Sequence, residues 1–378
     1  MQDANWNAAQ ATVRGNVGSR LAEGESGVLV TVVDVEGSAY RRPGAKMLIG
    51  SDGSDVGSVS AGCLEPAIER VADEVFDSGR SRVETFGLTG ESDDDVWGLG
   101  LGCDGIVTLL FEPVTSALEP AAAAFAGGET VVSVTPLEGE SVGVRAYFDE
   151  TGGEVRPAPA LPDWVGERAG DVAERFAGSG QSAAVALDGD GEQLEVFVDV
   201  MEAQPELVVF GSGHDVAPLV ALGRQSGFRV TVVGFRGGTD LVGTFPEADD
   251  HVTTSAPTVA EDVRLDERTY AVVMTHNFVD DRLVLEALLD SPVPYVGLMG
   301  PRERFEEMRE EFGAEGRPLT PEELERVYTP VGLDLGGGEP YQVALSIVSE
   351  VMAVHNGREP THLNEREGPI HPRLERVE

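Results

Sequence analysis

The chain has 378 residues, too many for one ordinary hydrophobic core, so the sequence predicts two or three domains. Its 67 acidic and 27 basic residues leave a net charge of −40, which disfavours nucleic-acid binding because the protein repels phosphate. Residues 1–25 are polar without the apolar core of a secretory signal, and no run reaches the ~18 apolar residues of a membrane helix, so we expect a cytoplasmic protein.

The first half of the chain mixes short strand patterns with a few amphipathic helices, which predicts an α+β domain. Predicted strands cover residues 28–35, 46–49, 56–60, 82–86, 106–111, 131–136, 142–148, 183–187 and 194–200. Predicted helices cover residues 1–24, 64–78, part of 113–128, and 164–176.

A glycine- and serine-rich segment, residues 37–65, contains the most reactive set of side chains. Arg41, Arg42 and Lys46 lie in it, and Lys46 is the only lysine among the 27 basic residues of the chain. Cys63 follows Gly62 at the start of a predicted helix, where free N–H groups and the helix dipole attract an anion and favour a thiolate. This combination predicts a site for an anionic ligand. The alternative is that Cys63 is an inert core cysteine.

The second cysteine, Cys103, lies in another glycine-rich segment, residues 97–105, just before a predicted strand. Two cysteines cannot form a disulfide framework, and alone they cannot supply four zinc ligands. Because each cysteine stands where a loop meets a regular element, both could line one cleft.

From residue 207 onward, strands and helices alternate. Predicted strands cover residues 207–210, 229–233, 271–274 and 295–298, and predicted helices follow at about 216, 280–289, after Pro301, and 340–354. This alternation predicts a Rossmann-like, doubly wound parallel sheet.

The turn after the first of these strands carries part of a dinucleotide fingerprint. Gly211 and Gly213 match it, but Val216 stands at the third glycine position and Gly234 replaces the acid that holds the ribose. Arg236 could accept a 2′-phosphate, which would favour NADP over NAD. The sequence leaves open whether this domain binds a dinucleotide or serves as a scaffold.

Three further polar residues follow strands of the same sheet. His214 follows the predicted strand 207–210, His276 follows the predicted strand 271–274, and Arg302 follows a glycine-rich turn after residues 295–298. Ligands bind at the carboxyl ends of strands in such sheets, so these side chains are candidate ligand contacts. The alternative for each histidine is a hydrogen-bonding role within its loop.

Acidic residues occur in every segment, and lysine is almost absent. Such a surface is typical of proteins from salt-rich cytoplasm, where screening weakens the repulsion between like charges. We therefore expect a halophilic source. The charged segment 358–378 is expected to be a poorly ordered tail.

Several sequence blocks together resemble the XdhC/CoxI family, accessory proteins of molybdenum hydroxylases such as xanthine dehydrogenase and carbon monoxide dehydrogenase. The resemblance covers residues 10–357, and its blocks are 37–38, 42–47, 57–65, 98–103, 211–215, 275–276, 296–302, 330–335 and 344–350. It implies domains over residues 1–203 and 204–357. Gly234 stands where the family often has an aspartate.

The resemblance implies that the protein binds molybdenum cofactor, protects it while a cysteine desulfurase installs a sulfido ligand, and delivers it to the apoenzyme. It implies a cofactor chaperone, expected as a homodimer, and not an enzyme that turns over substrate. The implied cofactor-binding residues are Arg42, Lys46, Ser60, Gly62, Cys63, Glu65, Cys103, Gly211, Gly213, His214, His276 and Arg302. Cys63 and Cys103 would meet the molybdenum, a soft metal centre. The alternatives are an NADP-dependent oxidoreductase and a non-catalytic assembly scaffold.

Overall fold

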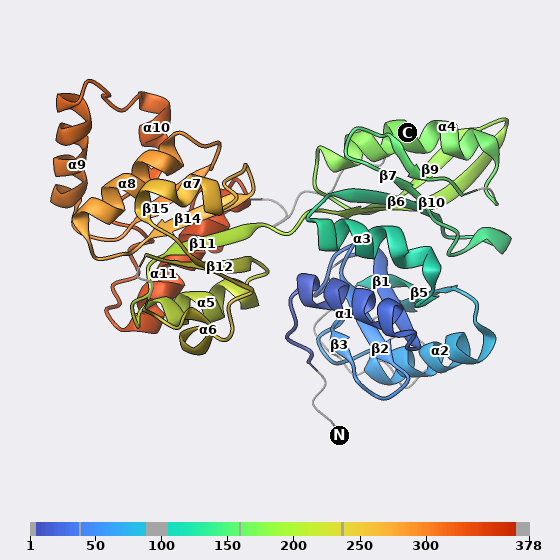
Figure 1. Cartoon of the computed structure of the whole chain (residues 1–378). Coiled ribbons are helices and arrows are strands. Elements are labelled where there is room, and N and C mark those ends of the chain that lie inside the picture. The colour runs from blue at the N-terminus through green and yellow to red at the C-terminus, as the bar shows by residue number, and fades with distance from the viewer. Residues whose placement is uncertain (1–4, 38, 88–104, 159, 236–237, 368–378) are drawn as a thin grey trace. The chain divides into compact units, whose positions relative to one another are not determined.

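A computed structural model describes residues 5–37, 39–87, 105–158, 160–235 and 238–367 (Figure 1). The chain divides into two compact units, of which the first ends at Ala203 and the second begins at Gln204. Within the described residues, no helix is both long and apolar enough to cross a membrane.

The first unit contains a five-stranded antiparallel sheet in the order β3-β2-β1-β5-β4. Its strands are β1 Gly27–Glu36, β2 Lys46–Gly50, β3 Val56–Gly57, β4 Arg82–Gly87 and β5 Ile106–Pro113. Helix α2, Glu65–Ser78, covers one face, where Val30 and Met47 join its apolar side. Helix α1, Gln10–Glu23, packs on Leu29 and Leu48 of the other face. Neighbouring residues of β1 and β2 thus point into different cores, as the two-residue period of a strand requires.

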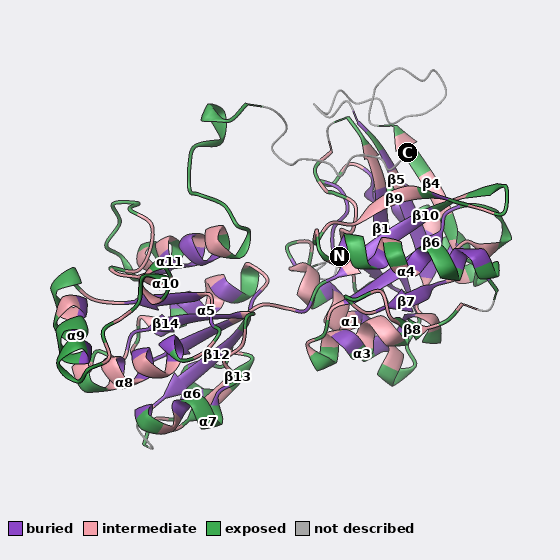
Figure 2. Cartoon of the chain, turned by 90° about the horizontal axis from the view of Figure 1, so that it is seen from above, coloured by how far each residue is buried: buried purple, intermediate pink, exposed green. Residues whose placement is uncertain are grey.

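A second antiparallel sheet of the same unit has the order β8-β7-β6-β10-β9. Its elements are β6 Val131–Pro136, β7 Ala146–Phe148, β8 Glu154–Arg156, β9 Ala183–Gly189 and β10 Glu192–Met201, with helices α3 Glu119–Gly127 and α4 Asp163–Ala177. Helix α4 covers one face (Figure 2). On the opposite face, Phe197 packs against Val33 of β1 and Leu110 of β5. The two sheets therefore pack against each other, and each is also covered by a helix.

The second unit is a six-stranded parallel sheet in the order β13-β12-β11-β14-β15-β16. Its strands are β11 Glu206–Phe210, β12 Arg229–Gly234, β13 Asp250–Thr253, β14 Thr269–Val273, β15 Tyr295–Leu298 and β16 Val327–Tyr328. Its helices are α5 Val216–Gln225, α6 Leu241–Thr244, α7 Val259–Asp262, α8 Phe278–Leu289, α9 Arg302–Ala314, α10 Pro321–Glu325 and α11 Pro340–His355.

Helices cover both faces of this parallel sheet. Residues of α5 and α11 join one core, and residues of α7, α8 and α9 join the other. The strands are correspondingly buried (Figure 2). The predicted fold class, a mixed α+β domain followed by a doubly wound parallel sheet, is confirmed.

Two predicted strands are shorter than expected. The strand predicted over 142–148 covers only Ala146–Phe148, because Gly143 has a φ of 82° and interrupts the extended chain. The strand predicted over 56–60 ends at Gly57, also with positive φ (82°), and the next residues enter a loop. Strands β8, β13 and β16 and the short helices α6, α7 and α10 were not predicted.

Candidate functional site

The loop from Ser58 to Leu64 presents Cys63 at the amino end of α2. Cys63 lies two residues before the first helical residue, Glu65, and its partly buried free thiol packs beside the core under α2. Gly62 has a φ of 109°, a left-handed conformation that favours glycine. The prediction that Cys63 stands at a helix N-terminus is confirmed.

Ser60 holds this loop in shape. Its hydroxyl donates to Glu65 Oε1 at 2.7 Å and accepts from the backbone N–H groups of Gly62 and Leu64 at 3.1 and 3.4 Å. Glu65 is buried, and its Oε2 has no hydrogen-bond partner among the described residues. Ser60, Gly62, Cys63 and Glu65 are therefore brought together, with one buried acceptor left unsatisfied.

Arg41 joins a second loop to this one. Its Nη2 donates to Ser58 Oγ at 2.9 Å, and its guanidinium lies 5.4 Å from the ring of Tyr40. Its Nε is buried, again without a partner in the described part of the chain. Arg42 is exposed. Arg41, absent from the predicted binding residues, is thus the arginine that connects the two loops.

Lys46 lies elsewhere. Its ammonium group donates to Gly44 O at 2.9 Å and lies 2.9 and 2.8 Å from the two carboxylate oxygens of Asp199. Burial lowers the pKa of Lys46, and Asp199 partly offsets this. Met47 points into the core under α2, so Lys46 points to the opposite face of the sheet. The structure therefore gives Lys46 a buried ion pair and does not bring its ammonium group to the loop of Cys63.

The second unit has its own candidate crevice, where the order of the parallel strands reverses between β11 and β14. Gly211 is required here, because a Cβ would lie 2.4 Å from Met274 O. His276 has a φ of 59°, unusual for a residue other than glycine, and its Nε2 lies 3.1 Å from Asp215 Oδ2. A Cβ on Gly213 would lie 2.4 Å from Asp215 Oδ1. Gly211, Gly213 and His276 thus meet at the switch point, together with Asp215, which sequence reasoning missed although it follows His214.

At the end of β12, where the dinucleotide fingerprint has an acidic residue, Gly234 leaves no space for a side chain. A Cβ on Gly234 would lie 3.0 Å from Leu241 Cδ2, so a side chain there would point into the packing of α6. His214 is exposed in the loop after β11, and exposed Arg302 begins α9 after β15. Arg236 and Cys103 lie outside the described residues.

The family blocks near the chain's end have a structural role. Glu350 of α11 is buried and accepts from Tyr295 Oη at 2.7 Å and from the Gly332 backbone N–H at 2.9 Å. Ser346 donates to Leu333 O at 2.5 Å. Residues 330–335 are thereby fixed against α11. Among the residues that the structure describes, no group of three or more His, Cys, Asp or Glu side chains could hold a metal ion.

Together, the fold and the site define a two-unit α/β protein in which a cysteine loop on an antiparallel domain precedes a Rossmann-type domain. Two family models match: "XdhC Rossmann domain" over residues 207–351 and "XdhC and CoxI family" over residues 20–87. The chain belongs to the XdhC and CoxI family, and the resemblance seen in the sequence is confirmed.

Similar proteins include a probable xanthine dehydrogenase subunit of Bacillus subtilis (strain 168), 28% identical over 336 residues, which are 88% of this chain and 94% of that protein. The molybdenum cofactor insertion chaperone PaoD of Escherichia coli (strain K12) is 39% identical over 97 residues, 26% of this chain and 29% of PaoD. A crystal structure of a xanthine dehydrogenase from Bacillus halodurans superimposes with a TM-score of 0.73 at 27% identity, covering 92% of this chain and 96% of that one.

Proposed function

We propose that this protein is a maturation chaperone for a molybdenum hydroxylase of the xanthine dehydrogenase or carbon monoxide dehydrogenase type. It binds molybdenum cofactor as cargo, holds it while a cysteine desulfurase installs the sulfido ligand, and delivers it to the apoenzyme. Membership of the XdhC and CoxI family supports this role, as does the similarity to a relative named as a molybdenum cofactor insertion chaperone.

The observation that carries the proposal is the pair of joined loops around Cys63. Arg41 Nε and Glu65 Oε2 are a buried donor and a buried acceptor without partners in the described residues. Each such group costs about 1–3 kcal/mol when unpaired, so a ligand that satisfies them gains affinity. A pterin supplies both acceptors and N–H donors, its phosphate suits exposed Arg42, and its soft metal centre suits the sulfur of Cys63.

The test is native mass spectrometry of the full chain, purified anaerobically from cells that express the partner hydroxylase. The wild-type protein is expected to carry a pterin. Arg41→Met should lose it, because the variant removes the link to Ser58 and the unpaired Nε. Arg80→Met, at an exposed position beyond α2, is the matched control and should keep it.

Two outcomes contradict the proposal. A nicotinamide cofactor in place of the pterin would favour an oxidoreductase. A protein that carries neither, although the partner enzyme matures, would favour an assembly scaffold.

A further inference from the structure

Buried charges gather between the two sheets of the first unit, on the face away from Cys63. Arg145 Nε donates to Glu112 Oε1 at 2.9 Å, its Nη2 contacts Glu112 Oε2, and its Nη1 donates to Ser133 Oγ at 2.7 Å. Lys46 is paired with Asp199, as described above. All four charged side chains are buried. Each of these two cations therefore has its own carboxylate.

Arg14 of α1 is a third cation beside this cluster. Its Nη1 donates to the backbone oxygen of Glu202 at 2.6 Å, and its guanidinium lies 4.6 Å from the Phe125 ring. Within the described residues it has no carboxylate inside ion-pair distance, and its Nη2 is buried without a hydrogen-bond partner. Burial lowers the pKa of Arg14, opposed by Asp199 and Glu202, but a guanidinium keeps its proton in proteins.

Counting Arg14, which is partly buried, the cluster holds three cations, two of them buried, and two buried carboxylates. Glu202 also attracts Arg14, but it is an exposed residue, so its carboxylate is not a buried counter-charge. One positive charge is therefore left without a buried counter-charge. The buried Nη2 of Arg14 lacks a hydrogen-bond partner within the described residues, and an anion beside it would supply one.

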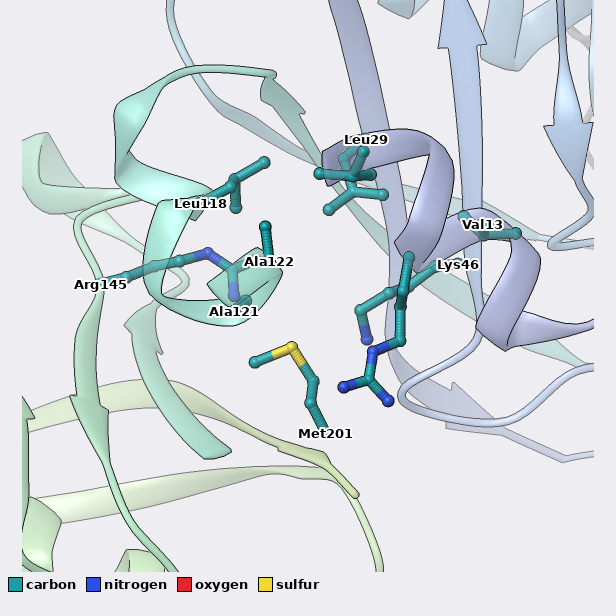
Figure 3. Close-up of a pocket in the computed structure, with 10 residues that line it drawn as sticks. Val13, Leu29, Lys46, Leu118, Ala121, Ala122, Arg145 and Met201 are labelled. Atoms are coloured by element: carbon teal, nitrogen blue, oxygen red, sulfur yellow. The ribbon is translucent and has the colours of Figure 1, made fainter. Parts of the chain in front are cut away.

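A small cavity lies among these cations. Arg14, Lys46 and Arg145 line it together with apolar side chains. Figure 3 labels Lys46, Arg145 and the apolar Met201 around it. The centre of a water-sized sphere can occupy about 20 Å³ of it. Because one water needs about 10–15 Å³ by this measure, the cavity has room for a monatomic ion and not for phosphate or sulfate.

We infer that this cavity binds one monatomic inorganic anion, chloride in the cell, with the unpaired Nη2 of Arg14 as a donor. The positive charge of the lining side chains favours an anion over water, and the small volume of the cavity excludes oxyanions. The largely apolar wall suits a weakly hydrated halide. The site is separate from the proposed cofactor loop, because Lys46 and Met47 point to opposite faces of β2. The bound halide would stabilise the folded first unit by mass action.

The test compares melting curves of the full chain in potassium chloride, potassium bromide and potassium gluconate at equal ionic strength, so that general screening is matched. At halide concentrations ten times the dissociation constant, we expect a melting temperature about 3–6 °C higher than without the bound ion. Arg14→Met should abolish the difference between halide and gluconate. Arg156→Met should keep it, since Arg156 likewise donates to a backbone oxygen, that of Ser116 at 2.8 Å, but does not line the cavity.

Crystals of the wild-type protein grown in bromide give a readout that does not depend on whether Arg14→Met folds. An anomalous bromide peak between Arg14 and Lys46 is expected. A water in the cavity without an anomalous peak would overturn the inference, and so would a halide effect that survives in Arg14→Met.

Discussion

Replacing Lys46 by methionine should destabilise the first unit by about 3–5 kcal/mol, because it leaves the carboxylate of Asp199 buried and without its counter-charge. Asp199 is fully buried, and its other polar neighbours are Ser182 Oγ at 3.3 Å and Arg145 Nη1 at 3.9 Å, of which Arg145 is already paired with Glu112. Arg14 also attracts Asp199, but from beyond ion-pair distance. Methionine keeps most of the lysine stem, so lost packing contributes little. At about 2–4 °C per kcal/mol for a unit of this size, the melting temperature should fall by about 6–20 °C.

The assay is calorimetry or urea denaturation of the full chain, applied to Lys46→Met, Asp199→Asn and the double variant. The double variant should recover much of the loss, because no buried charge of the pair remains alone. Arg82→Met, which breaks two ion pairs at the surface of the same unit, with Glu74 and Glu84, is the control and should cost less than about 1 kcal/mol. A Lys46→Met melting temperature within the range of that control would refute the reasoning. Below its transition, Lys46→Met should still carry cofactor, since the ammonium group does not face the Cys63 loop.

Four other outcomes are expected. Cys63→Ala should lose cofactor content and partner maturation with an unchanged melting curve; normal loading would make Cys63 a core residue. Dialysis to low salt should abolish the native circular dichroism. The Debye length grows from ~3 Å at 1 M salt to ~30 Å at 0.01 M, so the repulsion among the acidic residues, with a net charge of −40, is no longer screened. Full stability at low salt would contradict a halophilic source. Calorimetric titration should show no micromolar binding of NAD, because Gly234 offers no carboxylate to the ribose and Leu241 occupies the space beside it. Burial raises the pKa of Tyr147 to about 12, so the folded state holds the phenolic proton more tightly than the unfolded state does. The stability that this difference contributes is complete below pH 10 and is lost as the pH rises towards 12. Urea denaturation should therefore show a steeper loss of stability at alkaline pH for the wild type than for Tyr147→Phe.

The parallel sheet was the most predictable part of the fold. Its central strands are buried on both faces and therefore read as continuous apolar runs, such as Leu207–Phe210 and Tyr295–Leu298. The strands that were missed lie at its edges. Strand β13 has the sequence Asp-His-Val-Thr, and β16 has two residues, so neither has an apolar run that could be recognised.

The candidate sites divide in the same way. Cys63 was placed correctly because a local pattern, glycine followed by cysteine and a helical repeat, determines its position. The meeting of Gly211 and His276 followed from topology, since carboxyl ends of adjacent parallel strands must converge. The partner of Lys46 could not be predicted: Asp199 lies 153 residues away, and only the packing of two separate antiparallel sheets brings them together.

The single lysine has a physical explanation in that pairing. On an exposed surface, either arginine or lysine can supply a positive charge, so the choice between them says little about where a residue lies in the structure. Between the sheets the requirements differ. A compact ammonium group matches the acceptors present, the backbone oxygen of Gly44 and the two oxygens of Asp199. A guanidinium is larger and brings five N–H donors in a rigid plane, beside Arg14 and Arg145, which already crowd the same cavity with positive charge. Lys46, the single lysine of the chain, is therefore explained by its buried position. In a chain with so few lysines, a lysine is better evidence of a specific set of buried hydrogen-bond acceptors than of a bound ligand.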